Sequence, residues 1–309
     1  MSTTSNVNKI ITINIINQVE AVGSQYVTFQ EFQTQVEECK EILQDIIIEN
    51  PNSNQEITVL FGSNEFNQNS DTLGWASGGT IAINQYNTGL YYLNDTQEHQ
   101  NISVIIHEII HVFGLFPNQV GGNITTVSDT SASNGSTRRI YTGPKGLEGY
   151  KKLLLANNIK VPDPLYIFLE DDFESGTVNV HLEEAYNSEN DKYEVINING
   201  QYYPSLWNEI MTGLLDKDNN YITPITTGCL EDLGFKINHN SRYIVSTGNN
   251  MKFVNDTKQE QKGTNNNYFT FSEINYDLKY LNKFLKKNNI INPSILIENL
   301  KDNWGNNII

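Results

Sequence analysis

Residues 95–114, a segment with a very apolar second half, contain the pattern His-Glu-Ile-Ile-His and constrain the fold more than any other part of the chain. Isoleucine, valine and phenylalanine fill most other positions of its second half, which predicts a buried helix. Asp95 is a candidate N-cap, and Glu98 three residues later completes a capping box. Burying two imidazoles and a carboxylate without a partner costs several kcal/mol. The segment therefore predicts a metal-binding helix inside the protein.

The spacing of the polar residues in this helix indicates a zinc site. His107 and His111 lie four residues apart on one helical face, so both rings can bind a single cation. Glu108 lies beside that face, where its carboxylate can reach a metal-bound water without binding the metal. This H-E-x-x-H arrangement is typical of zinc hydrolases. Gly114 predicts a sharp turn that ends the helix. We expect one zinc ion per chain, with Glu108 as the catalytic base.

A third metal ligand is expected from further along the chain. His181 follows alternating valines and is the strongest histidine candidate. His99 and His239 occur in polar surroundings and are expected at the surface. A carboxylate is the alternative, as in other zinc hydrolases, and the sequence leaves both possibilities open. The candidate carboxylates are Glu183, Glu184 and Glu209.

Local patterns predict an α+β fold in which a twisted mixed sheet lies over the zinc-binding helix, followed by a mainly helical C-terminal appendage. Residues 116–145 are polar and predict a long loop. Strands are expected at 9–16, 56–61 and 89–93, with a strand, glycine turn and strand over 74–84, and helices are expected at 28–49, 146–158, 223–235 and 272–287. The polar run 255–267 predicts a linker.

Composition excludes several other classes of protein. The chain has 36 acidic and 20 basic residues, and its net charge of −16 argues against nucleic acid as a partner. The two cysteines, Cys39 and Cys229, form no metal-binding spacing and are expected to be free and buried. No apolar run is long enough to span a membrane, and the first residues show no signal-peptide pattern. A cytoplasmic or non-classically exported protein is therefore expected, of unknown oligomeric state.

Several motifs follow one another along the chain: G-G-T-I-A-I-N (78–84), H-E-I-I-H-V-F-G (107–114), G-P-K-G-L-E-G-Y (143–150), His181 with Glu183, N-E-I-M-T (208–212) and E-D-L-G-F (231–235). Together and in this order they resemble the leishmanolysin family of metzincin zinc metallopeptidases. The chain departs from that family in its low cysteine content and in Leu182, which follows His181 where an aromatic residue is usual. His181 and Met211 are also further apart than the family pattern implies, so residues 186–202 are expected to be an insertion.

The resemblance implies a zinc peptidase domain over residues 1–235, with a long insertion at 115–180 and His181 as the third zinc ligand. It also implies a Met-turn in which Met211 lies beneath the metal. Residues 236–309 would form a polar linker and a small helical region.

The implied function is a zinc metalloendopeptidase that hydrolyses protein or peptide substrates with a zinc-bound water activated by Glu108. We expect an extended substrate to pair with a strand edge at 80–84. The alternatives are a zinc hydrolase with a carboxylate third ligand, and a non-catalytic metallo-fold used for adhesion or binding.

Overall fold

The computed structural model describes residues 11–18, 28–52, 55–63, 66, 72–86, 100–116, 123–129, 137–171, 178–187, 192–193, 195–206, 208–215, 220–246 and 253–254. The chain divides into two compact units, Met1–Phe271 and Ser272–Ile309. The predicted linker at 255–267 and helix at 272–287 lie outside the described residues, so they remain predictions, as does the proposed domain boundary at 235.

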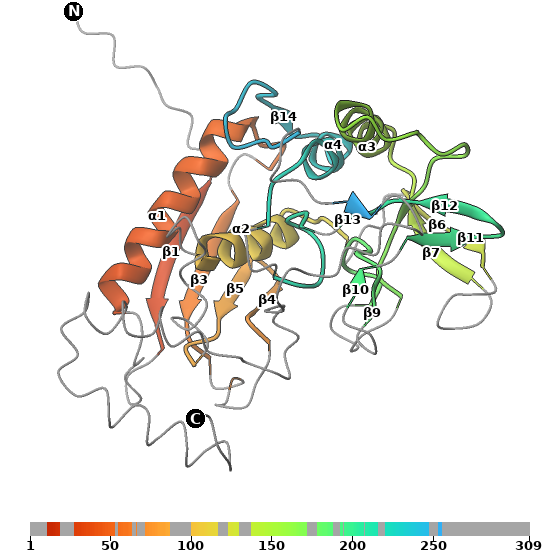
Figure 1. The fold of residues 1–309 in the computed structure, drawn as a ribbon. Coiled ribbons are helices and arrows are strands. Elements are labelled where there is room, and N and C mark those ends of the chain that lie inside the picture. The colour runs from red at the N-terminus through yellow and green to blue at the C-terminus, as the bar shows by residue number, and fades with distance from the viewer. Residues whose placement is uncertain are drawn as a thin grey trace, which may run out of the picture. The chain divides into compact units, whose positions relative to one another are not determined.

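A four-stranded mixed sheet carries the N-terminal part of the fold (Figure 1). Its order is β1 (Thr12–Asn17), β3 (Glu56–Phe61), β5 (Thr80–Ile83) and β4 (Gly74–Ser77). The first three strands are parallel, and β4 runs antiparallel to β5. The strand expected at 56–61 and the two strands expected within 74–84 are confirmed. Gly78 and Gly79 make the turn between β4 and β5 with positive φ angles of 56° and 87°, a region that glycine enters at little cost.

Helices α1 (Phe29–Ile46) and α2 (Gln100–Val112) pack against each other and against this sheet (Figure 1). Helix α1 begins with a capping box, in which the Thr28 hydroxyl accepts from the Glu31 amide at 3.2 Å and the Glu31 carboxylate accepts from the Thr28 amide at 2.8 Å. Between the helices, the Asn101 amide group donates to Gln35 at 2.6 Å. The inner face of α1 is buried through Phe32, Val36, Cys39, Leu43 and Ile46.

Parts of the chain just before α2 lie outside the described residues. The capping pair Asp95 and Glu98 and the strand expected at 89–93 therefore remain predictions. Helix α1 ends three residues earlier than expected and continues directly into β2 (Ile47–Glu49). This short strand pairs with β14 (Lys236–Ile237), so the chain just beyond residue 235 returns to the end of α1.

The prediction of a long loop at 116–145 is wrong for the described residues from 124 onward. Residues there form a hairpin of β6 (Ile124–Ser128) and β7 (Thr137–Tyr141), and β7 also pairs with β8 (Ile167–Phe168). Only the end of β7, at Ile140 and Tyr141, is buried. The other positions are mostly polar because they face solvent or charged groups, so the segment lacked the apolar alternation that predicts a strand.

Helices α3 (Pro144–Ala156) and α4 (Pro224–Asp232) confirm the helices expected at 146–158 and 223–235, with shifted ends. They lie side by side (Figure 1) with their backbones in contact. A Cβ added at Gly149 would lie 1.9 Å from the Pro224 carbonyl oxygen, and one added at Gly228 would lie 2.2 Å from the Lys145 carbonyl oxygen. The glycines of the 143–150 segment therefore permit this close helix contact.

The remaining strands are short antiparallel pairs. Residues 186–203 form β9 (Tyr186–Asn187) with β10 (Lys192–Tyr193) and β11 (Ile196–Ile198) with β12 (Gln201–Tyr203). A further pair joins β13 (Ser205–Leu206) to β15 (Phe253–Val254). Cys39 and Cys229 are free and buried, as expected. Among the described helices, none is long and apolar enough to cross a membrane.

Candidate metal centre

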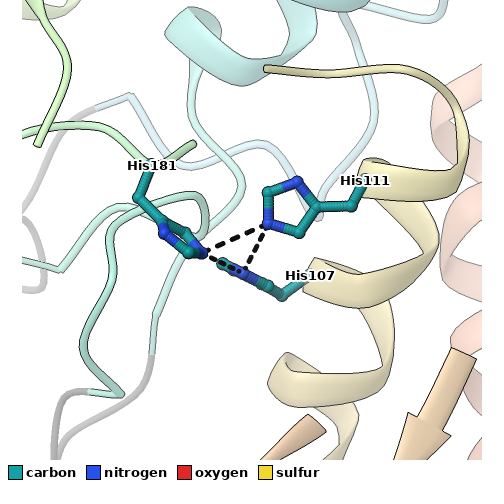
Figure 2. Close-up of side chains that lie close together, drawn as sticks. All are labelled: His107, His111 and His181. Carbon is teal, nitrogen blue, oxygen red and sulfur yellow. Dashed lines mark hydrogen bonds between the residues drawn. The ribbon is translucent and has the colours of Figure 1, made fainter. Parts of the chain in front are cut away.

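Three histidine rings converge beside α2 (Figure 2). His107 and His111 extend from adjacent turns of the helix, and His181 approaches them from the segment that follows β8. The Nε2 atom of His107 lies 3.0 Å from that of His111 and 3.0 Å from that of His181. The Nε2 atoms of His111 and His181 are 3.2 Å apart. The structure thus joins the pair on the helix to the predicted third histidine.

Hydrogen bonds at the outer ring nitrogens fix the tautomer of two of these rings. Nδ1 of His107 lies 2.6 Å from the Ile210 carbonyl oxygen, and Nδ1 of His111 lies 3.1 Å from the Leu115 carbonyl oxygen. A carbonyl oxygen only accepts hydrogen bonds, so each Nδ1 carries the proton in a neutral ring. The two Nε2 atoms then present lone pairs to each other at 3.0 Å.

Burial keeps both rings neutral. It lowers the pKa of His107 to about 4 and the pKa of His111 well below its usual value, against the opposing effect of the carbonyl partners. Neutral imidazoles with converging lone pairs repel one another unless a cation lies between them. Three imidazole nitrogens with one position left open are the donor set of catalytic zinc sites, so these residues fit a zinc ion.

Backbone hydrogen bonds on both sides hold the segment of His181. The Leu182 amide donates to the Met211 carbonyl at 2.8 Å, and the Glu183 amide donates to the Phe168 carbonyl at 3.0 Å. The His181 carbonyl accepts from the Glu170 amide at 3.0 Å. Residues 178–180 form a turn and Leu182 makes isolated bridges, so the segment is not a regular strand.

Glu108, the residue that follows His107 on α2, is buried at 7% exposure. Burial raises its pKa to about 8. A Cβ added at Gly74 would lie 2.9 Å from Oε1 of Glu108, so the carboxylate lies against the start of β4. After α2, Gly114 has a positive φ of 99° and its amide donates to the His111 carbonyl at 2.9 Å. The chain therefore turns sharply one residue after Phe113.

The carboxylates considered as alternative ligands contact other groups. Glu183 accepts from the Arg138 guanidinium at 2.7 Å, and Glu184 accepts from the Gly213 amide at 3.0 Å. Glu209 accepts from the Met211 amide at 2.6 Å.

Of the two other histidines, the structure describes only His239. His239 is exposed and lies 3.1 Å from Glu231, whereas His99 lies outside the described residues.

A buried charge cluster near His181 was missed by the sequence interpretation. The Arg138 guanidinium lies 3.1 Å from Asp129, 3.1 Å from Asp171 and 2.7 Å from Glu183. Glu170, Asp171 and Glu183 also have carboxylate oxygens close together. No local pattern predicts this cluster, because most of the acids are far from the arginine in sequence. The one hint in the sequence is a pair of adjacent arginines in a chain where arginine is rare.

Comparison with known proteins gives one family match. The model of the reprolysin-like metallo-peptidase family M12B matches residues 1–116. No curated protein and no solved structure matches the chain. The matched region contains His107, Glu108 and His111 and ends two residues after Gly114. It supports a metallopeptidase of the metzincin type and does not single out the leishmanolysin family, while the residues that follow, including His181, lie outside the match.

Proposed function

We propose that this protein is a zinc-dependent endopeptidase in which His107, His111 and His181 bind the metal. The observation that carries the proposal is the convergence of three Nε2 atoms within 3.0–3.2 Å, two of them on neutral rings with outward Nδ1 protons. The reprolysin-like match over residues 1–116 supports it independently.

Glu108 is the proposed general base. A zinc ion bound by three histidines supplies an acidified water and polarises the substrate carbonyl. Glu108 follows His107 in the same helix, and its Oε1 lies beside the start of β4. From there its carboxylate can accept a proton from the attacking water and pass it to the leaving nitrogen. Burial by α2 and the sheet keeps bulk water away from this transfer.

The substrate is proposed to bind along β4. The expectation that it pairs with residues 80–84 is wrong, because β5 is already paired with β3 on one side and β4 on the other. Among the described strands β4 pairs only with β5, so it is the edge of the sheet. The edge starts at Gly74, next to Glu108. An extended peptide added to β4 would therefore present its backbone close to the proposed base.

We also propose that the chain is related to the leishmanolysin family in particular. It rests on the segments at 143–150, 208–212 and 231–235, all outside the matched residues. Met211 is fully buried in the turn whose preceding carbonyl accepts from His107. We place Met211 beneath the metal on that basis, and a peptidase domain over residues 1–235 with its long insertion at 115–180 follows from the same resemblance.

Zinc content and peptidase activity measured together test the proposal. Purified wild-type protein should bind one zinc ion per chain and cleave casein or a mixed peptide library. Glu108→Gln should keep the zinc and lose activity by about a hundredfold or more. Glu37→Gln, an exposed glutamate on α1, is the matched control and should keep both.

Two outcomes would overturn it. Zinc-loaded wild type that cleaves no peptide, with Glu108→Gln behaving identically, would leave a metal-containing binding module. Full zinc content in His181→Ala would show that His181 is not the third ligand.

A further inference from the structure

The carboxylate of Glu209 is fully buried and lies one residue before a carbonyl that contacts the metal centre. Its Oε2 accepts from the Met211 amide at 2.6 Å. Its Oε1 accepts from the Thr223 hydroxyl at 3.0 Å and also from the Thr226 hydroxyl. These three donors join the turn at 208–212 to the first turn of α4. The carboxylate takes no part in the mechanism proposed above.

Two consecutive carbonyls of the turn that Glu209 fixes contact the proposed zinc ligand His107 and Leu182, the residue that follows the proposed ligand His181. The Ile210 carbonyl accepts from Nδ1 of His107 at 2.6 Å. The Met211 carbonyl accepts from the Leu182 amide at 2.8 Å and so positions the residue next to His181. A shift of this turn would therefore move His107 and the segment of His181 together.

Most of the hydrogen bonds that hold this turn involve Glu209. Its own carbonyl accepts from the Thr212 amide at 3.2 Å, from the Thr212 hydroxyl at 2.8 Å and from Asn220 at 3.1 Å. The Ile210 amide donates to the Tyr221 carbonyl at 2.8 Å. The carboxylate is the element that ties this turn to α4, because both of its hydroxyl partners belong to that helix or its N-cap.

We infer that Glu209 is a positioning residue for the zinc site, which it holds in shape through the carbonyls of Ile210 and Met211. The inference rests on the proposed function. A buried carboxylate suits this role because it accepts several hydrogen bonds at once, which a neutral apolar side chain cannot do. Outer partners of metal-binding histidines typically change metal affinity by about 10- to 100-fold when they are removed.

Zinc affinity, measured by competition with a chelator on folded protein, tests this inference. Glu209→Ala should weaken zinc binding by about 10- to 100-fold and alter the visible absorption of the cobalt-substituted protein. Glu209→Gln should restore most of the affinity, because its amide oxygen can accept from the Met211 amide while its NH2 group donates to the two hydroxyls. If Glu209→Ala weakened zinc binding only through a general loss of stability, the cobalt spectrum of the folded variant would not change and Glu209→Gln would not restore the affinity.

Asp232→Asn is the matched control. Asp232, the last residue of α4, is a carboxylate that accepts from two backbone amides, those of Lys145 and Gly146, and no hydrogen bond joins it to 210 or 211. Its loss should reduce stability and leave zinc affinity unchanged.

The outcomes distinguish a failure of the proposed function from a failure of the positioning role of Glu209. Wild-type protein that binds no zinc would overturn the proposed function. Wild-type zinc binding that Glu209→Ala leaves intact would overturn only the positioning role. If Glu209→Ala does not fold, Thr226→Val decides: a few-fold loss of zinc affinity supports the inference, and wild-type affinity overturns it.

Discussion

Residues 11–116 and residues 123–254 are stabilised by different kinds of interaction. The first region has strands of up to six residues and two helices whose buried residues are mostly apolar. In the second region the strands are two to five residues long, and polar groups such as the half-buried Arg138 and the buried Glu209 make hydrogen bonds between separate segments. The metal centre combines both regions, since two histidines come from the apolar helix and the third from a polar, irregular segment.

This difference indicates where the site is most easily disturbed. His107 and His111 are fixed by the packing of α2, whose residues Ile105 and Ile109 are fully buried in the core. His181 depends on backbone bonds to neighbours on either side. We therefore expect changes in the second region to affect the third ligand while the helix keeps the first two in place.

The largest expected effect is that of Arg138→Met. Its guanidinium contacts two buried carboxylates, Asp129 and Glu183, and the half-buried Asp171. Removing one partner of a buried ion pair typically costs about 3–5 kcal/mol. Lys40→Met is the matched control in the first region, because Lys40 forms an exposed pair with Glu37 that contributes about 0.5 kcal/mol or less. Denaturant unfolding of both variants measures the difference. Equal losses would show that the two regions do not differ as described.

The same difference explains how much of the molecule the sequence could predict. The helix expected at 28–49 and the strand expected at 56–61 follow from local patterns, and the structure has both, although the helix ends three residues early. The hairpin of β6 and β7 was missed because its outward positions are polar and its stability depends on contacts with distant residues.

For the metal site, too, the sequence predicts what local spacing determines and misses contacts between distant segments. The pairing of His107 with His111 follows from helical spacing alone. The approach of His181 depends on a hydrogen bond from Leu182 to Met211, which no local pattern encodes, and the role of Arg138 depends on carboxylates from three separate segments.

A pH-dependent effect is expected at Glu209. Burial raises its pKa to about 7 against the lowering effect of its hydrogen-bond donors, and the buried Cys229 thiol also lies near it. The folded protein then binds a proton that the unfolded chain releases between pH 4.5 and 7. The stability from this group is therefore present below its ordinary pKa and is lost as pH rises through 7.

Glu209→Gln removes this titration. Between pH 5 and pH 8 the free energy of unfolding of the variant should rise relative to wild type by up to about 3 kcal/mol. Denaturant unfolding at several pH values measures the change. A difference between the two proteins that stays constant with pH would contradict the prediction.

A steric effect is expected where α3 meets α4. In Gly149→Ala the new methyl group would overlap the Pro224 carbonyl oxygen, and because that atom belongs to the backbone the helices must separate. Overpacking of this kind typically costs about 1–3 kcal/mol. Leu155→Ala on the same helix is the control, since Leu155 is 57% exposed and should change stability by about 0.5 kcal/mol or less. Thermal unfolding of both variants tests the contact.

The smallest expected effect is that of Thr28→Ala at the start of α1. The hydroxyl of Thr28 accepts from the Glu31 amide, and its loss should cost about 1 kcal/mol, as for other helix caps. Because the Glu31 carboxylate also accepts from the Thr28 amide, the effects of Thr28→Ala and Glu31→Ala should not add in the double variant. The capping pair lies far in sequence from the metal-binding residues, and α1 is held to α2 by its buried face, so zinc affinity should stay unchanged in all three variants. A loss of zinc affinity in Thr28→Ala would mean that the first region positions its two histidines through the end of α1 as well as through the apolar core.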